Sequence, residues 1–566
     1  MFKSNSLHPS SRLRNFFTKS AVTCAVNPIL KNVTRNAAAL VAQGLNLLPG
    51  QAPSSVVVEL KGAYPVTRPA NPLPIPIPGQ PRVETLLEFQ RKLKVLSRVA
   101  DLKHVILLNR GLECGLATAF AMKQALEELR GSGKRVTLYA DGTDNLTLYL
   151  SAGCDEFVML REGVMGAVGV AARVVFLGET MKKLGINLEF ERRSEYKAAP
   201  ERFSETAFSP AYRESLTALL ESVQHHWLEV IGTGRKLELT GLREAIDAAP
   251  MMADEALGRG LLTGVAFEDE IALNAKPIVE ALRFAPPALR WDEPATVALI
   301  SLEGGIADGE SRNVPVPIPL IGGQQAGGYS LARALRSAAQ DKNVKAIVFH
   351  VNSPGGSALA SELIWREVER AKAVKPVVVV MGELAASGGY YVACNATKII
   401  AAPSTITGSI GVFNLHPDSS GLWARLGFKP ETIKLSAHAD YGSPDRPLSI
   451  DERQNMSRMV ERIYTTFKTR VADGRGLSLA QVEEVARGRI WSGAQGLHNG
   501  LVDELGTLFD GIRLAKRLAG LPETASVTSF TPPAKYIAAT DLAAIAKVLR
   551  VSTQIWAALP DGLELR

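Results

Sequence analysis

Two glycine-rich strings in the C-terminal half directly follow buried-type apolar runs, and they could bind an oxyanion. Asn-Ser-Pro-Gly-Gly (352–356) ends one run and Ala-Ser-Gly-Gly-Tyr (386–390) ends the next. Paired glycines let backbone N–H groups face a ligand without an obstructing side chain. Because parallel strands end at the same edge of a sheet, the two strings should meet there. This pattern predicts an oxyanion hole, with Ser387 placed as a nucleophile beside it.

The other interpretation of Ser387 is that it caps a helix, which is a common role for serine at such a boundary. An internal repeat weighs against this. At a shift of 242 residues Ser387 falls on Asn145, and the glycines after it fall on Leu146 and Thr147. A cap would tolerate Asn equally well, whereas an acyl-transfer site needs the glycine pair, which only the C-terminal copy carries.

A serine nucleophile needs a general base, and the eight histidines offer little. His350, at the end of the run before the first glycine string, is the best of them, but a buried strand histidine is more often part of the packing. No Gly-x-Ser-x-Gly elbow is present, and Thr-Gly-Ser-Ile-Gly (407–411) has the wrong spacing. The sequence therefore gives no support for a Ser/His/Asp triad.

Lysine is the alternative base, because burial disfavours its charged form and lowers its pKa. Ser-Glu-Tyr-Lys-Ala-Ala-Pro (194–200) aligns with Ala-Asp-Tyr-Gly-Ser-Pro (439–444), which places Lys197 opposite Gly442. By base rate a loop lysine is usually solvated. Here, however, one copy keeps the lysine and the other keeps the serine, as expected if a single composite site is assembled across the duplication.

The elements that must position these residues also repeat. At the same shift 56–62 falls on 298–304, 105–111 on 347–353, and 148–160 on 390–402. Continuous apolar runs alternate with helical patterns such as 357–373, which predicts parallel β/α layers. We expect an α/β chain of two tandem domains at 53–290 and 291–530. A basic tail or targeting segment (1–52) precedes them, and a tail with an amphipathic helix at 541–559 (531–566) follows.

Composition excludes several classes of function. The net charge of +7 is concentrated in residues 1–58, which hold six Lys and Arg and no acid. The remaining body is nearly neutral, so no nucleic-acid partner is expected. The cysteines (Cys24, Cys114, Cys154 and Cys394) are far apart, which predicts free buried thiols and no zinc site. No apolar stretch is long enough to span a bilayer.

Together these motifs resemble the long, duplicated form of protease IV, the signal peptide peptidase A family, which is related to the Clp protease and crotonase superfamily. The resemblance covers about residues 55–525 and rests on the two glycine strings, 403–412 and Tyr-Lys-Ala-Ala-Pro-Glu (196–201). It implies two Clp/crotonase-like domains and a serine endopeptidase with a Ser/Lys dyad.

The resemblance also assigns roles to individual residues. It makes Ser387 the nucleophile and Lys197 the general base, with Ser409 orienting the lysine. The backbone N–H groups of Gly388 and of Gly355 or Gly356 would form the oxyanion hole. No cofactor or metal is implied.

For substrates and partners, the resemblance implies small or unfolded peptides, cleaved signal peptides included, and a homotetramer. It also implies association with a membrane at the cell envelope. Because no span is visible in the sequence, peripheral membrane contact and a soluble or organelle-targeted location stay open. Two other functions are weighed against the peptidase: a crotonase-like acyl-CoA enzyme using the same glycine loops, and a catalytically silent scaffold.

Overall fold

The N-terminal half is built on a parallel sheet. The computed structural model describes residues 52–68, 83–284, 295–314 and 322–537, and the backbone of 556–558 and 564–565. The sheet order is β10-β1-β2-β3-β4-β9, and every pairing in it is parallel. Its strands are β1 (Ser55–Gly62), β2 (His104–Leu112), β3 (Arg135–Ala140), β4 (Glu156–Met159), β9 (Gly264–Val265) and β10 (Lys276–Pro277).

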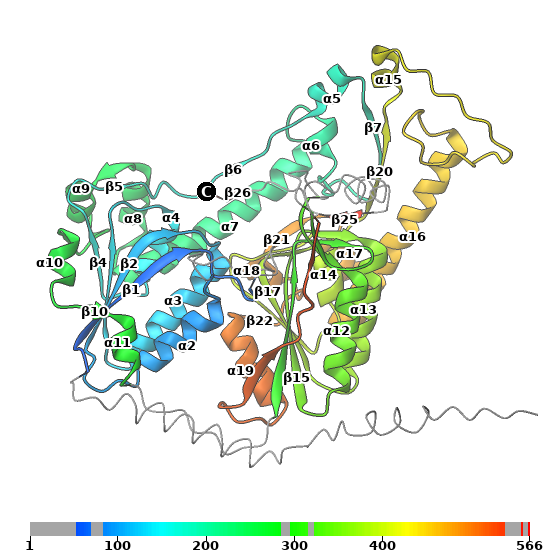
Figure 1. Cartoon of the computed structure of the whole chain (residues 1–566). Helices are drawn as coiled ribbons and strands as arrows, with labels where there is room; N and C mark the ends of the chain where they lie inside the picture. The colour runs from blue at the N-terminus through cyan, green and yellow to red at the C-terminus, as the bar shows by residue number, and fades with distance from the viewer. Residues whose placement is uncertain are drawn as a thin grey trace, which may run out of the picture. The chain divides into compact units, whose positions relative to one another are not determined.

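The C-terminal half repeats this order. Its strands β23 (Ser526–Ser529), β11 (Thr296–Glu303), β15 (Val344–Ser353), β17 (Val377–Ala386), β18 (Lys398–Ala401) and β22 (Glu504–Leu505) are hydrogen-bonded in that sequence. Two further strands, β19 (Ile406–Gly408) and β21 (Ile490–Ser492), extend the sheet beyond the end of β17. The predicted duplication of α/β layers is therefore confirmed (Figure 1). The boundaries 53–290 and 291–530 stay predictions, and residues 285–294 between the halves lie outside the described residues.

Helices cover both sheets. In the N-terminal half they are α2 (Leu86–Leu96), α3 (Leu116–Gly131), α4 (Asn145–Ser151), α5 (Gly178–Leu184), α6 (Glu201–Ser204), α7 (Pro210–Arg235), α8 (Leu239–Asp247), α9 (Ala253–Gly258), α10 (Glu268–Ala272) and α11 (Ile278–Leu282). In the C-terminal half they are α12 (Gly328–Gln340), α13 (Ala358–Lys372), α14 (Gly388–Ala393), α15 (Ser420–Leu426), α16 (Ile450–Arg475), α17 (Leu479–Val485), α18 (Gly493–His498) and α19 (Leu508–Leu518). Helix α13 lies where the charge pattern predicted a helix.

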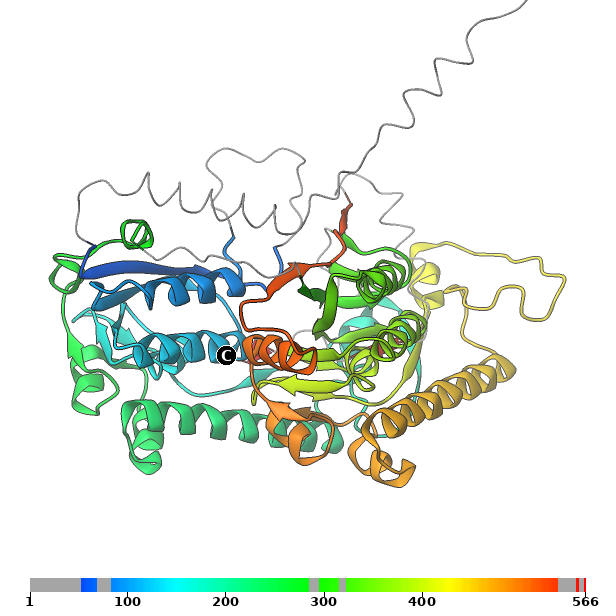
Figure 2. The same cartoon turned by 90° about the horizontal axis from the view of Figure 1, so that it is seen from below.

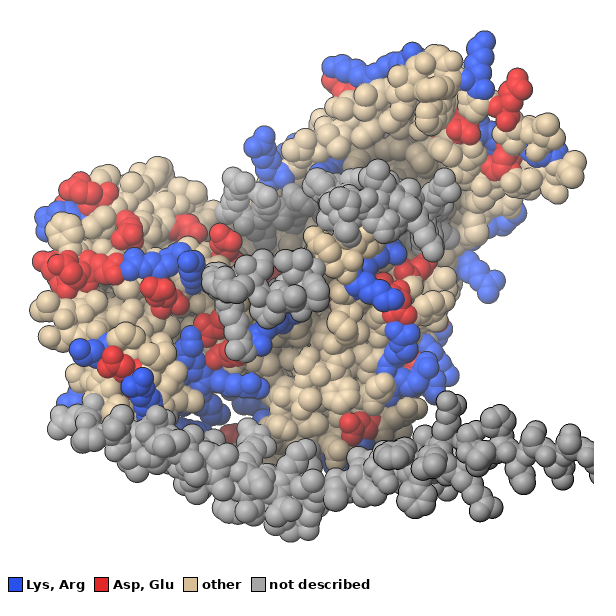
Figure 3. Space-filling model, viewed as in Figure 1, with Lys and Arg blue, Asp and Glu red and all other residues tan. Residues whose placement is uncertain are grey.

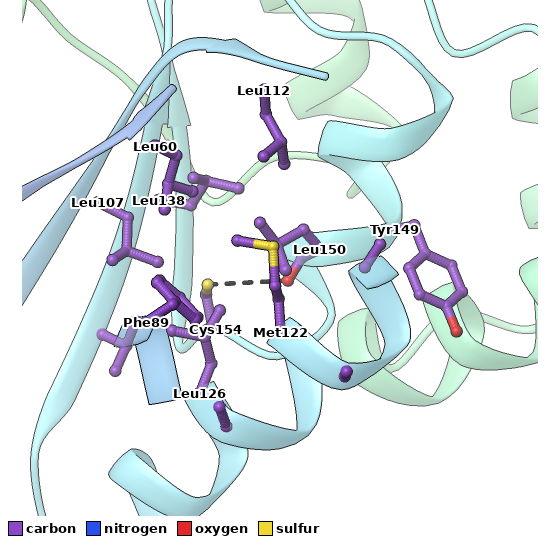
Figure 4. Packing of buried hydrophobic residues seen from close by; sticks show 14 of the residues in the cluster. Leu60, Phe89, Leu107, Leu112, Met122, Leu126, Leu138, Tyr149, Leu150 and Cys154 are labelled. Atoms are coloured by element: carbon purple, nitrogen blue, oxygen red, sulfur yellow. Dashed lines mark hydrogen bonds between the residues drawn. The ribbon is translucent and has the colours of Figure 1, made fainter. Parts of the chain in front are cut away.

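One hydrophobic core crosses the duplication. Buried residues of β1, β2 and α3 form a single cluster with buried residues of β15, β17 and α19. In the N-terminal part of this cluster Phe89, Leu107, Met122 and Leu126 pack around Cys154 (Figure 4). Burial raises the pKa of the Cys154 thiol to about 12. Cys154 and Cys394 are buried free thiols as predicted, Cys114 is free but only part-buried, and Cys24 lies outside the described residues.

The two halves are also joined by an antiparallel strand pair. Strand β7 (Asn187–Arg192) of the N-terminal half pairs with β20 (Phe413–Asp418) of the C-terminal half, in a register from Phe413 opposite Arg192 to Asp418 opposite Asn187. We call this pair, with the N-terminus of α16 beside it, the intrachain joint. The chain that leaves β7 enters the turn that carries Lys197.

The β7/β20 pair of the joint forms one end of a second mixed sheet. Its order is β24-β13-β14-β12-β16-β25-β20-β7. The members not yet given are β12 (Gly305–Ala307), β13 (Arg312–Val314), β14 (Gly323–Gly327), β16 (Gly355–Ser357), β24 (Lys535–Tyr536) and β25 (Trp556–Ala558). The remaining strands of the chain form small pairs: β5 (Val164–Met165) with β8 (Met251–Met252), and β6 (Ala172–Arg173) with β26 (Glu564–Leu565).

Strand β25 corrects part of the sequence prediction. The helix expected at 541–559 does not include residues 556–558, because these pair as a strand with β16 and β20. The free backbone groups of those neighbouring strands are satisfied by an extended segment and not by a helix. The rest of that predicted helix, like the tail 1–51, lies outside the described residues.

On the face shown in Figure 3, basic and acidic side chains of the described residues lie near one another over much of the surface. Among the described residues no cluster of three or more His, Cys, Asp or Glu could hold a metal ion. In the same part of the chain, none of the helices is both long and apolar enough to cross a bilayer.

Candidate active site

Ser387 lies where β17 ends and α14 begins, and it does not act as a cap. Its backbone has φ +57° and ψ −115°, and its side chain makes no capping hydrogen bond to the helix. A non-glycine residue at positive φ is strained, and such residues concentrate at functional sites. The structure thus removes the alternative that Ser387 is only a helix cap and leaves its hydroxyl available for chemistry.

Ser409 is held next to Ser387 by the sheet. It follows β19, which pairs in parallel with the end of β17, and the Ser387 backbone N–H donates to the Gly408 carbonyl at 2.8 Å. Both serines therefore stand at the carboxyl edge of neighbouring strands. The two glycine strings also meet at this edge, as the sequence analysis expected, since Ser353 pairs with Ala385. Ser387 has no exposed surface and Ser409 is 2% exposed.

Lys197 comes from the other half and points between these serines. Its Nζ lies 2.6 Å from Ser387 Oγ and 3.0 Å from Ser409 Oγ, and it donates to the Ser409 carbonyl at 3.1 Å. The side chain is 1% exposed. Burial lowers the pKa of Lys197 well below its usual value, because the ammonium loses its hydration without gaining a carboxylate partner.

The turn that carries Lys197 is fixed by residues that the sequence analysis missed. Arg192 Nη1 donates to the Lys197 carbonyl at 3.2 Å and to Glu201 Oε1 at 2.6 Å. Ser209 Oγ donates to the same carboxylate at 3.0 Å. The signal that could have found them is the charged pair flanking the lysine in the string Arg-Arg-Ser-Glu-Tyr-Lys-Ala-Ala-Pro-Glu (192–201).

Two glycines of the C-terminal half make room for the lysine. A Cβ added at Gly488 would lie 2.5 Å from the Lys197 backbone nitrogen, and one at Gly411 would lie 3.2 Å from Lys197 Cδ. Gly488 also has φ +81°, a conformation that favours glycine. The backbone of 488 therefore forms one wall of the lysine pocket and helps to exclude water from it.

The expected oxyanion glycines are not equivalent. Gly388 is the first residue of α14, where a backbone N–H has no partner inside the helix. The Gly355 N–H donates to Ser353 Oγ at 3.1 Å, so it is already engaged. Gly356 pairs with Ile306 of β12 and with Ala557 of β25. Gly389 has a packing reason for being glycine, since a Cβ there would lie 2.8 Å from the Ser353 carbonyl oxygen.

His350 belongs to a separate buried cluster. Its Nδ1 lies 3.0 Å from Ser301 Oγ and 3.1 Å from Glu303 Oε1. Asn352 Nδ2 donates to the other oxygen of that carboxylate at 3.0 Å, and Asn352 Oδ1 accepts from the Leu384 N–H. His350 Nδ1 contacts both Ser301 and Glu303. In a triad, by contrast, one ring nitrogen contacts the serine and the other contacts the carboxylate. The cluster instead ties the ends of β15 and β17 together.

A protein-family model matches both halves of the chain. The model for "Peptidase family S49" matches the chain twice, at residues 128–281 and 369–522. The chain belongs to peptidase family S49. The two matches correspond to the two halves of the fold, so the internal repeat read from the sequence is a duplication of the family's domain.

Relatives of this S49 chain are named as proteases. It is 29% identical over 436 residues to "Serine protease SPPA, chloroplastic" of Arabidopsis thaliana, covering 74% of this chain and 63% of that protein. It is 32% identical over 420 residues to "Protease 4" of Salmonella typhi, covering 71% of this chain and 66% of that protein. The aligned regions thus span slightly less than two thirds of each relative. Family and relatives support a serine peptidase function and confirm the resemblance found in the motifs.

A solved structure shows a partial likeness. A ClpP1 mutant from Listeria monocytogenes is matched over 38% of this S49 chain and 94% of that chain, at 15% identity and a TM-score of 0.24. A likeness this partial carries no argument about the site.

Proposed function

We propose that this chain is a serine peptidase in which Ser387 and Lys197 form a catalytic dyad that hydrolyses small or unfolded peptides, cleaved signal peptides included. The observation that carries the proposal is the 2.6 Å separation of Lys197 Nζ and Ser387 Oγ, two side chains that are at most 1% exposed. An amine whose pKa is lowered by burial can be neutral and accept a proton.

In the first half of the reaction, Ser387 Oγ attacks the carbonyl carbon of the scissile bond while its proton passes to the Lys197 amine. The carbonyl π electrons move onto oxygen, where the Gly388 N–H is the best placed donor. An oxyanion donor of this kind contributes about 3–4 kcal/mol to catalysis. When the carbon–nitrogen bond breaks, the Lys197 ammonium returns the proton to the leaving amine. In the second half water repeats the sequence on the acyl-enzyme.

Ser409 has the role of a positioning residue in this scheme. Its hydroxyl and its carbonyl both contact Lys197 Nζ. With two fixed partners, the amine is directed at Ser387 Oγ and loses little freedom when the reaction begins.

Strand β25 supports an extended substrate. It lies between β16 and β20 and runs antiparallel to β16, which holds the glycines 355 and 356. An extended backbone therefore fits beside the oxyanion loop with strand-type hydrogen bonds, the mode in which peptides add to an open sheet edge. The resemblance also predicts a homotetramer and contact with a membrane at the cell envelope, and both stay predictions.

The test is hydrolysis of an unstructured peptide, together with labelling by a fluorophosphonate. Ser387→Ala and Lys197→Ala should each lower kcat by about 10⁴-fold or more, because nucleophile and base act as a unit. Lys182→Ala, an exposed lysine of α5 in the same half, is the matched control and should keep the full rate. Hydrolysis that survives in both dyad variants would exclude the proposed mechanism.

A further inference from the structure

Helix α3 belongs to the N-terminal half, but it lies against the C-terminal half. Gln124, in the middle of this helix, donates to Asp510 of α19 at 3.2 Å, and its Oε1 lies 2.6 Å from Thr507 Oγ1. Figure 2 shows α3, in light blue, next to the orange α19. The N-terminus of α3 meets β17, the strand that leads to Ser387.

The N-terminus of α3 has no cap of its own. The residue before the helix, Gly115, has no side chain to accept from the first backbone N–H groups, and the first turn contains no acid. The N–H groups at the start of a helix lack partners inside it, and a polar side chain at the N-cap usually satisfies some of them. Helices α2, α7 and α16 are capped in this way by Thr85, Ser209 and Ser449. Helix α3 needs an acceptor from elsewhere.

Glu383 of β17 supplies that acceptor from the other half of the chain. Its Oε2 accepts from the Ala117 N–H at 2.9 Å, and its Oε1 accepts from the Thr118 N–H and the Thr118 hydroxyl, both at 2.8 Å. The positive end of the helix also stabilises the charge of the carboxylate. One side chain of the nucleophile strand thus caps a helix of the half that carries the lysine.

Gly115 leaves room for this carboxylate. Its φ of −86° is open to any residue, so the backbone does not require glycine there. A Cβ added at Gly115 would, however, lie 2.2 Å from Glu383 Cδ and 2.3 Å from Glu383 Oε2. The helix therefore lacks the usual N-cap residue at the one position where such a residue would displace the carboxylate.

Glu383 lies in an irregular part of β17 shortly before Ser387. Strands β15 and β17 pair regularly as far as Met381, and the next paired residue of β17 is Ala385. Over this interval three residues of β17 (382–384) face one residue of β15. This is a bulge, and a bulge changes the direction of the strand that follows it. The position of Ser387 therefore depends on how the bulge is held.

Contacts from both halves hold the bulge. Within the C-terminal half, Asn352 Oδ1 accepts from the Leu384 N–H at 3.2 Å, and the Thr405 hydroxyl donates to the Gly382 carbonyl at 2.7 Å. From the N-terminal half, α3 binds the Glu383 carboxylate. The polar anchor of the bulge in the half that supplies the base is thus the N-terminus of α3.

The start of α3 also packs beside both members of the dyad. The sequence neighbours of the serine and the lysine, Ala386 and Ala198, belong to one buried apolar cluster. Leu116, the first residue of α3, and Leu384, the residue after Glu383, pack against this cluster. A shift of α3 relative to the bulge would therefore change the distance between the two reacting atoms.

From these contacts we infer that Glu383 is a positioning residue for the peptidase reaction. By binding the N-terminus of α3, it holds the end of β17, and with it Ser387, at the distance from Lys197 that proton transfer needs. The inference rests on the proposed function, because it concerns the alignment of the proposed dyad. Since Glu383 acts through the backbone of β17 and not on the substrate, its loss should lower kcat and leave KM nearly unchanged.

Peptide hydrolysis by variants of the full chain tests this role. Glu383→Ala should lower kcat, and the rate of fluorophosphonate labelling, by about 10- to 100-fold, with KM changed by less than about twofold. Gly115→Ala should have the same effect, because its Cβ displaces the carboxylate. Since both changes break one contact, the double variant should lose no more than the worse single variant. Thr85→Ala, which removes the cap of α2, is the matched control and should lose thermal stability but keep its kcat.

A further variant separates positioning from capping. In Glu383→Ala/Gly115→Asp, the new aspartate caps α3 from the N-cap position, so the Tm should return toward that of wild type. The kcat should stay low, because the new carboxylate is not attached to β17. If Glu383→Ala alone does not fold, this capped variant carries the comparison with wild type. A kcat that recovers together with the Tm, or a Glu383→Ala chain with the wild-type kcat, would overturn the inference.

Failure of this inference is distinguishable from failure of the proposed function. If the dyad is wrong, Ser387→Ala and Lys197→Ala keep their hydrolysis. If only the role of Glu383 is wrong, both of those variants are inactive while Glu383→Ala hydrolyses the peptide at the wild-type rate.

Discussion

At the scale of single residues, the site depends on an amine that is costly to bury. Lys197 is 1% exposed, and hydroxyl and carbonyl oxygens are its polar contacts. Burial lowers its pKa well below the usual value because a buried ammonium is poorly solvated there. The same burial that makes Lys197 a base must reduce the stability of the fold at neutral pH.

The sign of this effect can be tested with Lys197→Met. Between the lowered pKa in the folded chain and the ordinary pKa in the unfolded chain, the unfolded state binds the extra proton, so stability rises with pH. The variant removes this penalty and should be inactive but more stable than wild type at pH 7, by roughly 0.5–2 kcal/mol in urea unfolding. The gain should shrink as pH rises toward about 10, the unfolded lysine pKa, and should be lost above it.

The pH dependence of wild-type peptidase activity should report the same titration of Lys197. Protonation of Lys197 removes the base, so kcat should fall as pH decreases through the lowered pKa. A variant that is less stable than wild type at neutral pH, or a rate with no acidic decline at any pH at which the chain stays folded, would contradict a buried lysine that acts as the base.

At the scale of elements, backbone rather than side chains shapes the lysine pocket. Gly488 lies between α17 and β21, and its N–H donates to the Ile410 carbonyl at 2.9 Å. This bond places residue 488 against the Lys197 backbone, where no Cβ fits. The turn after β7 and the segment before β21 thus support each other across the duplication.

Gly488→Ala should therefore lower both stability and kcat by more than the backbone strain at residue 488 alone explains. An alanine at positive φ costs about 1–2 kcal/mol. The clash with Lys197 should add to that loss of stability, and displacement of the amine should lower kcat by about 100-fold.

Gly520→Ala is the matched control, because Gly520 has φ +63° and nothing within 4 Å of an added Cβ. It should lose stability in thermal unfolding by the backbone cost only and keep its kcat. Equal kcat values for the two alanine variants would show that Gly488 does not position the lysine.

At the scale of the whole molecule, duplication produces two copies of the domain but one active site. The intrachain joint brings Lys197 to Ser387. The residues that align with Ser387 and Lys197 across the duplication are Asn145 and Gly442. Because neither can act as nucleophile or base, each chain should carry a single active site.

Labelling stoichiometry tests this arrangement. A fluorophosphonate should add to each chain once, at Ser387, whatever the oligomeric state, as measured by intact-protein mass spectrometry. Ser387→Ala should take up no label. A second adduct on wild type, or labelling that persists in the variant, would show another reactive serine.

The sequence alone determined the duplication, the alternation of strands and helices, and the pairing of a serine in one copy with a lysine in the other. These follow from the order of residues alone, since strand periodicity and glycine strings are local patterns and the repeat is found by comparing the sequence with itself. The repeat was informative because each copy had lost a different part of the site.

Only the tertiary structure decided the distance between Ser387 and Lys197, which are 190 residues apart, and the burial that lowers the lysine pKa. It also showed Arg192, Glu201 and Gly488 around the lysine turn, and the strand at 556–558 where a helix was expected. These depend on which surfaces meet when the chain folds. A contact between distant segments is set by packing and solvent exclusion, which no local pattern of residues records.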